Sequence, residues 1–249
     1  MNNYFIFNGK DSRDFDIQLG EYPPIVKPRE RIETITVPGR SGTLHVKEDE
    51  YIFDSYIKPF NIVALNPAKI DEIIDWLQGS GEIIIGNEND WIYDGYISDA
   101  IEFTRFFRGW HKATVSVEVQ PFKKSRRVYT HELMTGNVDN WIQCNSDYPT
   151  PYVIDIMQHP WGLLNFQVND NLIRSILEAS DDYTGWVQVI SKSGIVKYQT
   201  EDDPLAPIKT YPLVMKNQKA TLLNKGTNNV KFKRNCLGPV TISYRNLQI

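Results

Sequence analysis

Cysteine, long apolar runs and a targeting segment are scarce or missing in this sequence. Only two cysteines occur in 249 residues, Cys144 and Cys236, and we expect two reduced thiols in a protein made in the cytoplasm, although they could lie close in space. The opening Met1-Asn2-Asn3 is followed by a short apolar stretch, Tyr4 to Phe7, which is too short for a signal peptide. No later run approaches the length of a membrane-spanning helix. We therefore expect neither a secreted, disulfide-stapled domain nor a membrane protein.

Catalytic and cofactor motifs are also missing. There is no phosphate loop, no Gly-x-Gly-x-x-Gly fingerprint and no Cys-x-x-Cys pair. Gly39 to Gly42 begins like a nucleophile elbow, but Thr43 replaces the required glycine, so we interpret this segment as a turn. The histidines never fall three or four residues apart, as a metal pair on a helix would: His45, His111, His131 and His159. The sequence predicts no catalytic residue, no cofactor and no metal site, and hence no enzyme.

The composition is that of a globular protein, with 41% hydrophobic, 12% aromatic and 23% charged residues. At about 100–150 residues per domain, the length favours two domains. Residues 1–124 carry 14 Lys and Arg against 20 Asp and Glu, and residues 125–249 carry 13 against 11, so an acidic first half precedes a nearly neutral second half. The acidic half argues against specific nucleic-acid binding, which requires clustered cations. We place the boundary after Lys124, inside the basic segment 121–127, which we interpret as a solvated connector.

The first domain, residues 1–124, is predicted to be mainly β with one helix. The alternation in 113–119 places Val115, Val117 and Val119 on one face of a strand. Asn66 is suited to the N-cap of a helix that ends before Gly79, with Ile70, Ile73, Ile74 and Leu77 on its apolar face and Asp71, Glu72 and Asp75 on a solvated one. Further strands are predicted over 4–7, 32–37, 51–63, 82–85 and 91–97.

The second domain, residues 125–249, is predicted to be a β-sandwich, because short strand candidates follow one another closely. Two tight turns with residues suited to positive φ, 168–172 and 191–194, agree with this. The strands are predicted over 152–157, 163–168, 172–176, 185–190, 194–198, 220–223, 229–232 and 240–244. Trp161, in a turn-prone segment between Pro160 and Gly162, is the best candidate for an exposed ring that stacks on a sugar, and burial in a core or an interface is the alternative.

The N-terminal half resembles a known family in three stretches of residues. These are Phe7-Asn8-Gly9 followed by Ser12-Arg13-Asp14-Phe15, then Pro28-Arg29-Glu30-Arg31, then Val37-Pro38-Gly39-Arg40-Ser41-Gly42. Together they resemble the distal tail (Dit) proteins of long, non-contractile-tailed bacteriophages. The resemblance covers residues 1 to about 122 firmly and the rest more loosely.

The resemblance implies a structural component of a phage or prophage tail tip. The first domains of six copies would form a ring, with the tail tube protein on one side and the tail-associated hub protein of the baseplate on the other. The second domain would be a galectin-like or carbohydrate-module-like sandwich that projects outward. In some relatives it carries a long inserted arm that holds receptor-binding proteins, and the roughly 125 residues here leave little room for such an arm. The protein would assemble in the host cytoplasm and act in the virion, and an acidic first domain suits a ring around a DNA channel.

Three arginines in the resembling stretches, Arg29, Arg31 and Arg40, are candidates for contacts between subunits, because arginine forms bidentate pairs and is enriched in interfaces. The alternative function is a carbohydrate-binding module that attaches the tail to the host wall; a wall-degrading enzyme ranks third. Because galectin sugar motifs are missing and Trp161 has no polar side chains beside it, we expect sugar affinity no tighter than about millimolar.

Overall fold

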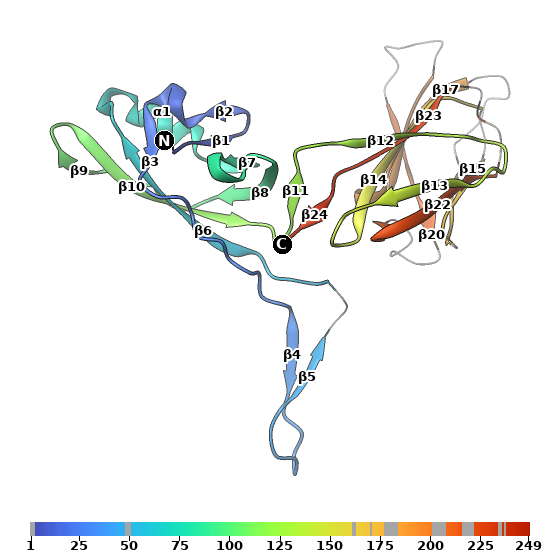
Figure 1. Ribbon diagram of the computed structural model, residues 1–249, viewed down its shortest axis with the longest axis horizontal. Helices are drawn as coiled ribbons and strands as arrows, with labels where there is room; N and C mark the ends of the chain where they lie inside the picture. Colours follow the sequence, from blue (N-terminus) through green and yellow to red (C-terminus); the bar gives the residue numbers. More distant parts are fainter. Residues whose placement is uncertain are drawn as a thin grey trace. The chain divides into compact units, whose positions relative to one another are not determined.

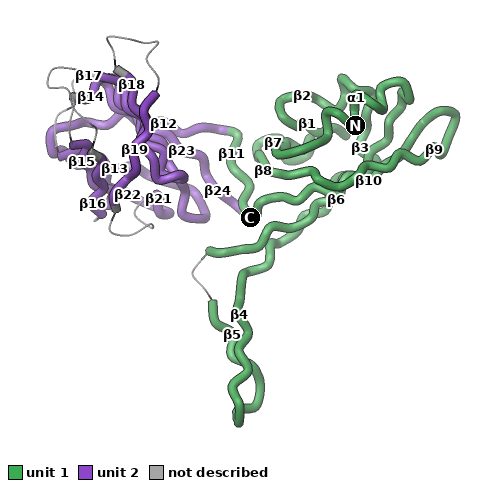
Figure 2. The backbone as a smooth tube through the Cα atoms, turned by 180° about the vertical axis from the view of Figure 1, so that it is seen from behind, with its two compact units in different colours: residues 1–126, 249 green, residues 127–248 purple. Residues whose placement is uncertain are grey.

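The computed structural model describes residues 3–47, 51–160, 163–169, 171–176, 184–200, 208–215, 222–233, 236 and 238–249. The chain divides into two compact units, Met1–Arg126 with Ile249, and Arg127–Gln248 (Figure 2). Strands dominate both units, which confirms the predicted mainly-β class. No helix in the described parts of the chain is long and apolar enough to span a membrane.

One antiparallel sheet forms the body of the first unit (Figure 1). Along its length, β10 alternates as predicted, since Val115, Val117 and Val119 are buried while Thr114 and Glu118 are exposed. The expected strand over 51–63 begins only at Tyr56, where pairing with β10 starts. The strand order is β2 (Lys10–Asp11), β1 (Phe5–Phe7), β7 (Gly79–Ile85), β8 (Trp91–Ile97), β10 (Trp110–Val119), β6 (Tyr56–Ala64) and β3 (Ile17–Leu19), with β9 (Thr104–Phe107) beside β10 and β11 (Lys123–Ser125) beside β8.

The predicted helix is present, with its first turn wound as a 3-10 helix, η2 (Pro67–Lys69), before α1 (Ile70–Trp76). The Asn66 side chain accepts a hydrogen bond from the Ala68 amide at 3.1 Å, which confirms the predicted cap. The three acidic residues of α1 are exposed, as expected. Ile74 was expected to face the core but is 41% exposed, and Trp76 is buried instead.

Trp76 is the centre of an aromatic cluster that attaches α1 to the sheet. Its ring stacks on Phe15 at 4.4 Å and on Phe5 at 5.5 Å between centroids. Its indole Nε1–H donates to the carbonyl of Phe7 at 3.0 Å, so the one polar atom of the ring is satisfied inside the core. Two further short 3-10 turns, η1 (Ser12–Phe15) and η3 (Gly86–Glu88), complete the unit.

A lysine is buried in the core face of β6. Lys58 is 1% exposed, and its Nζ donates to the carbonyl of Pro24 at 2.8 Å and lies 4.9 Å from the centre of the Tyr93 ring. Burial lowers the pKa of Lys58 below its ordinary value. The ammonium thus fastens the irregular strap 20–28 to the sheet, and that strap leads into the next strand, β4 (Ile32–Ile35).

Two antiparallel sheets form the second unit, as the predicted sandwich requires. The first contains β12 (Tyr129–Leu133), β23 (Val240–Tyr244), β14 (Thr150–Pro160), β17 (Thr184–Ile190), β18 (Ile195–Thr200) and β19 (Lys209–Pro212), with β21 (Leu222–Leu223) beside β14. The second contains β13 (Asn140–Cys144), β22 (Gly226–Phe232), β15 (Leu163–Val168), β16 (Asn171–Ile176) and β20 (Val214–Met215). The predicted turns carry the positive φ they require, 52° at Asn169 and 65° at Gly194, which ends η4 (Ser191–Ser193).

Both sheets bury alternate residues in one apolar core. Buried members such as Ile154 and Val187 come from the first sheet, and Phe166 and Val230 from the second. Cys144 is fully buried in this core and Cys236 packs partly against it, and both are free thiols. Burial raises the pKa of Cys236 to about 11, so this thiol stays protonated at neutral pH.

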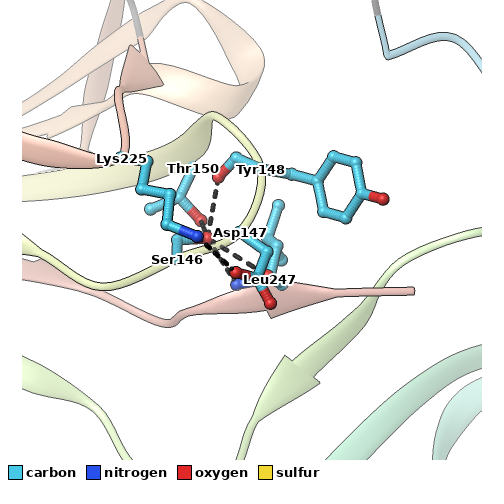
Figure 3. A network of polar contacts seen from close by, with 6 residues as sticks. All are labelled: Ser146, Asp147, Tyr148, Thr150, Lys225 and Leu247. Atoms are coloured by element: carbon cyan, nitrogen blue, oxygen red, sulfur yellow. Dashed lines mark hydrogen bonds and ion pairs between the residues drawn. The ribbon is translucent and has the colours of Figure 1, made fainter.

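A buried hydroxyl connects the end of the chain to this unit (Figure 3). Ser146 Oγ accepts from the amide of Leu247 at 2.7 Å and lies within donating distance of the Tyr148 carbonyl, at 2.7 Å. Thr150 Oγ1 donates to the carbonyl of Arg245 at 2.9 Å. These hydrogen bonds fix β24 (Leu247–Gln248), which pairs with none of the described strands of the second unit.

Candidate functional site

An isolated ribbon of two strands stands apart from the main sheet of the first unit. The strands β4 (Ile32–Ile35) and β5 (Leu44–Lys47) pair only with each other among the described strands, and every residue from 31 to 47 is exposed (Figure 1). A two-stranded ribbon is at best marginally stable alone in water. Its exposure therefore marks it as a surface that a partner would complete.

One face of the ribbon is mostly apolar. Ile35 lies opposite Leu44, and Glu33 opposite Val46, so these four side chains share a face. Ile35 and Leu44 are each 38% exposed and Val46 is 37% exposed. The other face is mostly polar and carries Thr34 and His45, which contact each other, together with Ile32 and Lys47. The ribbon thus offers a narrow strip of three apolar side chains on one face.

The three predicted arginines are distributed along this ribbon. Arg29 and Arg31 lie at its base, and Arg40 lies in the turn at its tip. The Arg31 guanidinium pairs with Asp54 at 2.9 Å between Nε and Oδ1, and Lys47 pairs with Glu30 at 2.6 Å, so two exposed ion pairs close the base. Within the described residues, neither Arg29 nor Arg40 forms an ion pair. Their assignment to subunit contacts stays a prediction.

The segment around Arg40 is a turn, as predicted. The Arg40 amide donates to the carbonyl of Val37 at 3.1 Å. Gly39 and Gly42 have φ of +81° and +84°, which favour glycine. The turn therefore places Arg40 in the exposed loop that joins β4 to β5 at the tip of the ribbon.

A second exposed hairpin was missed at the sequence level. Strands β9 and β10 meet at a turn of Arg108 and Gly109, where Phe107 is 52% exposed and Trp110 is 42% exposed. Their ring centroids lie 5.8 Å apart, and the Arg108 guanidinium lies 5.5 Å from the Phe107 ring. Aromatic residues and arginine are the types enriched in protein interfaces. The signal was available: aromatic residues on both sides of a glycine turn indicate a hairpin.

Part of the basic segment predicted to be a solvated connector instead packs into the first unit, which extends to Arg126, whereas Arg126 and Arg127 are exposed. Lys123 has a side chain only 11% exposed and pairs with Glu88 at 3.5 Å. Lys124 Nζ lies 2.7 Å from Asp94 and 2.9 Å from Glu82. The prediction failed for these lysines because β7, β8 and η3 supply acidic partners that neutralise them. The local sequence pattern does not show those partners.

Replacing Lys124 with Met is expected to lower the free energy of unfolding of the first unit by about 1 kcal/mol near neutral pH, a value kept small by solvent screening. Burial alone would lower the pKa of Lys124, but hydrogen bonds to Asp94 and Glu82 raise it above its ordinary 10.5. The contribution is therefore fully present below pH 10.5 and is lost as the pH rises through the folded-state pKa. Urea titrations of both proteins from about pH 8 to about pH 11.5 measure this. The prediction would be contradicted if the difference in unfolding free energy between wild type and Lys124→Met did not shrink as the pH rises. It would also be contradicted if Lys112→Met, at an exposed lysine, lowered the unfolding free energy by the same amount.

Trp161, the predicted sugar-stacking residue, lies outside the described residues, as do the acidic segments 48–50, 181–182 and 201–203. In the described part of the second unit, another tryptophan is prominently exposed. Trp141 on β13 is 69% exposed. Among described residues, no group of three His, Cys, Asp or Glu side chains is placed to hold a metal ion.

Comparison with known proteins finds similarity among solved structures. No family model and no curated protein sequence matches the chain. Among solved structures, the chain is similar to the crystal structure of the SPP1 Dit protein (gp 19.1), described as a paradigm of the hub adsorption apparatus in phages that infect Gram-positive hosts. The TM-score is 0.70 at 15% sequence identity, over 99% of each chain. The chain thus has a Dit-like fold, which confirms the resemblance at the level of fold.

Proposed function

We propose that this protein is a structural component of a phage or prophage tail tip, in which the first unit forms a ring between the tail tube and the hub proteins. The observation that carries the proposal is the Dit-like fold over the whole chain, including both units. The role is assembly rather than catalysis. Its place is the virion, after assembly in the host cytoplasm.

The exposed surfaces of the first unit support a ring built from heterologous contacts. In such a ring, one surface of each copy meets a different surface of the next copy. The apolar ribbon face and the aromatic hairpin of Phe107 and Trp110 are two distinct surfaces of this kind. A closed ring would bury both on every copy. The family resemblance supplies the number of six copies, and the second unit would project outward and carry receptor-binding proteins.

The proposal predicts rings when the neighbouring tail proteins are supplied. A free ribbon loses conformational freedom on assembly, so the isolated protein is expected to stay monomeric at low concentration. Mass photometry and negative-stain electron microscopy, with the hub and tube proteins of the same phage present, should show closed rings. A monomer that persists with both neighbours present would overturn the proposal.

A further inference from the structure

The second sheet of the second unit carries a polar face with a single large aromatic ring in it. Trp141 lies on β13, the edge strand, directly opposite Asn229 of β22. Its neighbours on either side are buried, Asn140 in a hydrogen-bond network and Ile142 in the core, so the strand is fixed beneath the exposed ring. The backbone under Trp141 is already ordered, so binding a ligand would order only the two side-chain torsions of this 69% exposed tryptophan.

Six side chains form an array of two columns and three rows on this face. Trp141 and Gln143 of β13 lie opposite Asn229 and Thr227 of β22. Asp139, directly before β13, contacts Asn229 and Lys231 and forms the third row with Lys231. Rows two residues apart are separated by about 7 Å. The array therefore spans about 14 Å along the strands, enough for two linked pyranose rings.

The rows on either side of Trp141 present hydrogen-bonding groups with unused capacity. The Asp139 carboxylate accepts a hydrogen bond from Asn229 Nδ2 at 2.9 Å and pairs with Lys231 Nζ at 3.3 Å, and it has further acceptor positions. The hydrogen bond from Asn229, with the nearby Lys231, lowers the pKa of Asp139, so it stays ionised. On the other side, Thr227 donates to Gln143 Oε1 at 3.0 Å, which leaves the Gln143 amide donors facing solvent.

This chemistry fits a sugar better than a protein. A pyranose has an apolar C–H face that stacks on an aromatic ring and a rim of hydroxyls that need donors and acceptors. The centre of a protein interface is instead depleted of charged residues, whereas the ion pair of Asp139 and Lys231 lies in the row next to Trp141. Within the array, Trp141 has only polar side chains in the flanking rows and opposite it.

We infer that the face around Trp141 is a carbohydrate-binding site for pyranose chains, with Trp141 stacking on the ring and Asp139 and Gln143 binding its hydroxyls. The small contact area limits the affinity of one copy to a dissociation constant on the order of 1 mM. Such a low affinity agrees with the weak sugar binding expected from the sequence, but the proposed stacking residue is Trp141 and not Trp161. Several copies held in one particle would strengthen it through multivalency.

The test is an NMR titration of the full-length, 15N-labelled chain with tetrasaccharides of β-linked glucose, galactose and N-acetylglucosamine. Substitution Trp141→Phe identifies the indole signal of Trp141 among those of the six tryptophans. We expect a saturable shift of that signal and of the Asn229 amide with at least one probe. Trp141→Ala should weaken binding by about tenfold or more, and Asp139→Asn, which preserves shape, by a few-fold.

Controls separate this site from folding and from the assembly role. Trp141 is mostly exposed, so its truncation should leave the thermal melt unchanged, and Tyr96→Ala, an exposed aromatic of the first unit, should bind sugar as the wild type does. The inference is overturned if no probe shifts the Trp141 signal at up to about 20 mM, or if Trp141→Ala binds equally well. Ring formation is scored separately and should be normal in Trp141→Ala, so failure of either proposal leaves the other standing.

Discussion

Replacing both Ile35 and Leu44 with Asp should abolish ring formation while leaving the fold intact. The two residues face each other on the apolar side of the ribbon, so the double change places two carboxylates where a neighbouring copy would cover them. Burying an unpaired charge costs several kcal/mol, and the concentration needed for assembly should rise about 100-fold or more. Because both residues are exposed in the monomer, its melting temperature should change by no more than about 2 °C. Mass photometry with the neighbouring tail proteins measures assembly, and calorimetry measures the melt.

The matched control for this prediction is the double variant Thr34→Asp with His45→Asp, which places two carboxylates opposite each other on the other face of the ribbon. It should assemble nearly as the wild type does. Arg40→Ala, at the tip of the ribbon, should weaken assembly to a smaller degree and leave the melt nearly unchanged. Normal rings from the Ile35 and Leu44 double variant would show that the ribbon is not part of the interface. A melting temperature lowered equally in all three variants would show that the ribbon supports the fold of the monomer.

Replacing Trp76 with Ala should cost the first unit about 3–5 kcal/mol of its free energy of unfolding, the largest stability effect we expect. The change removes the stacking on Phe15 and Phe5, opens a cavity under α1 and leaves the Phe7 carbonyl without its indole donor. Because the chain has two units, a single unfolding transition is not guaranteed. Hydrogen exchange in urea at the amides of β1 and β7 reads the first unit alone.

Ile74→Ala is the control for Trp76, since it lies on the same helix but is 41% exposed. It should cost under about 1 kcal/mol. A loss at Trp76 below about 1 kcal/mol would contradict the prediction. If the amides in the strands of the second unit lost as much protection from hydrogen exchange, the destabilisation by Trp76→Ala would not be confined to the core of the first unit.

Elements whose pattern depends on local chemistry could be predicted from the sequence. The alternation of Val115, Val117 and Val119 determines which face of β10 is buried, and Asn66 before Pro67 determines where the helix begins. Positive φ at Asn169 follows from the turn residues around it. These features need only a few neighbouring residues, so the sequence contains the information to place them.

Features that depend on partners distant in the sequence could not be predicted in the same way. Ile73, Trp76 and Leu77 are spaced i, i+3, i+4 and form the buried face of α1. Whether Trp76 or Ile74 joins that face depends on the aromatic partners of Trp76, which come from the first fifteen residues of the chain. Lys124 is paired by residues thirty and more positions earlier. Trp141 could not be separated from a core tryptophan until its register opposite Asn229 was known.

The buried amine of Lys58 has a practical consequence for mapping the assembly by chemical cross-linking. A neutral, solvent-accessible lysine amine attacks amine-reactive reagents, and Lys58, which is 1% exposed and bonded to the Pro24 carbonyl, must first be uncovered by movement of the chain around it. An acyl group on Lys58 would remove the charge, enlarge the side chain and prevent the strap from closing again. A cross-link or label at Lys58 therefore identifies molecules that had opened before they reacted, and distance restraints from those molecules should be discarded.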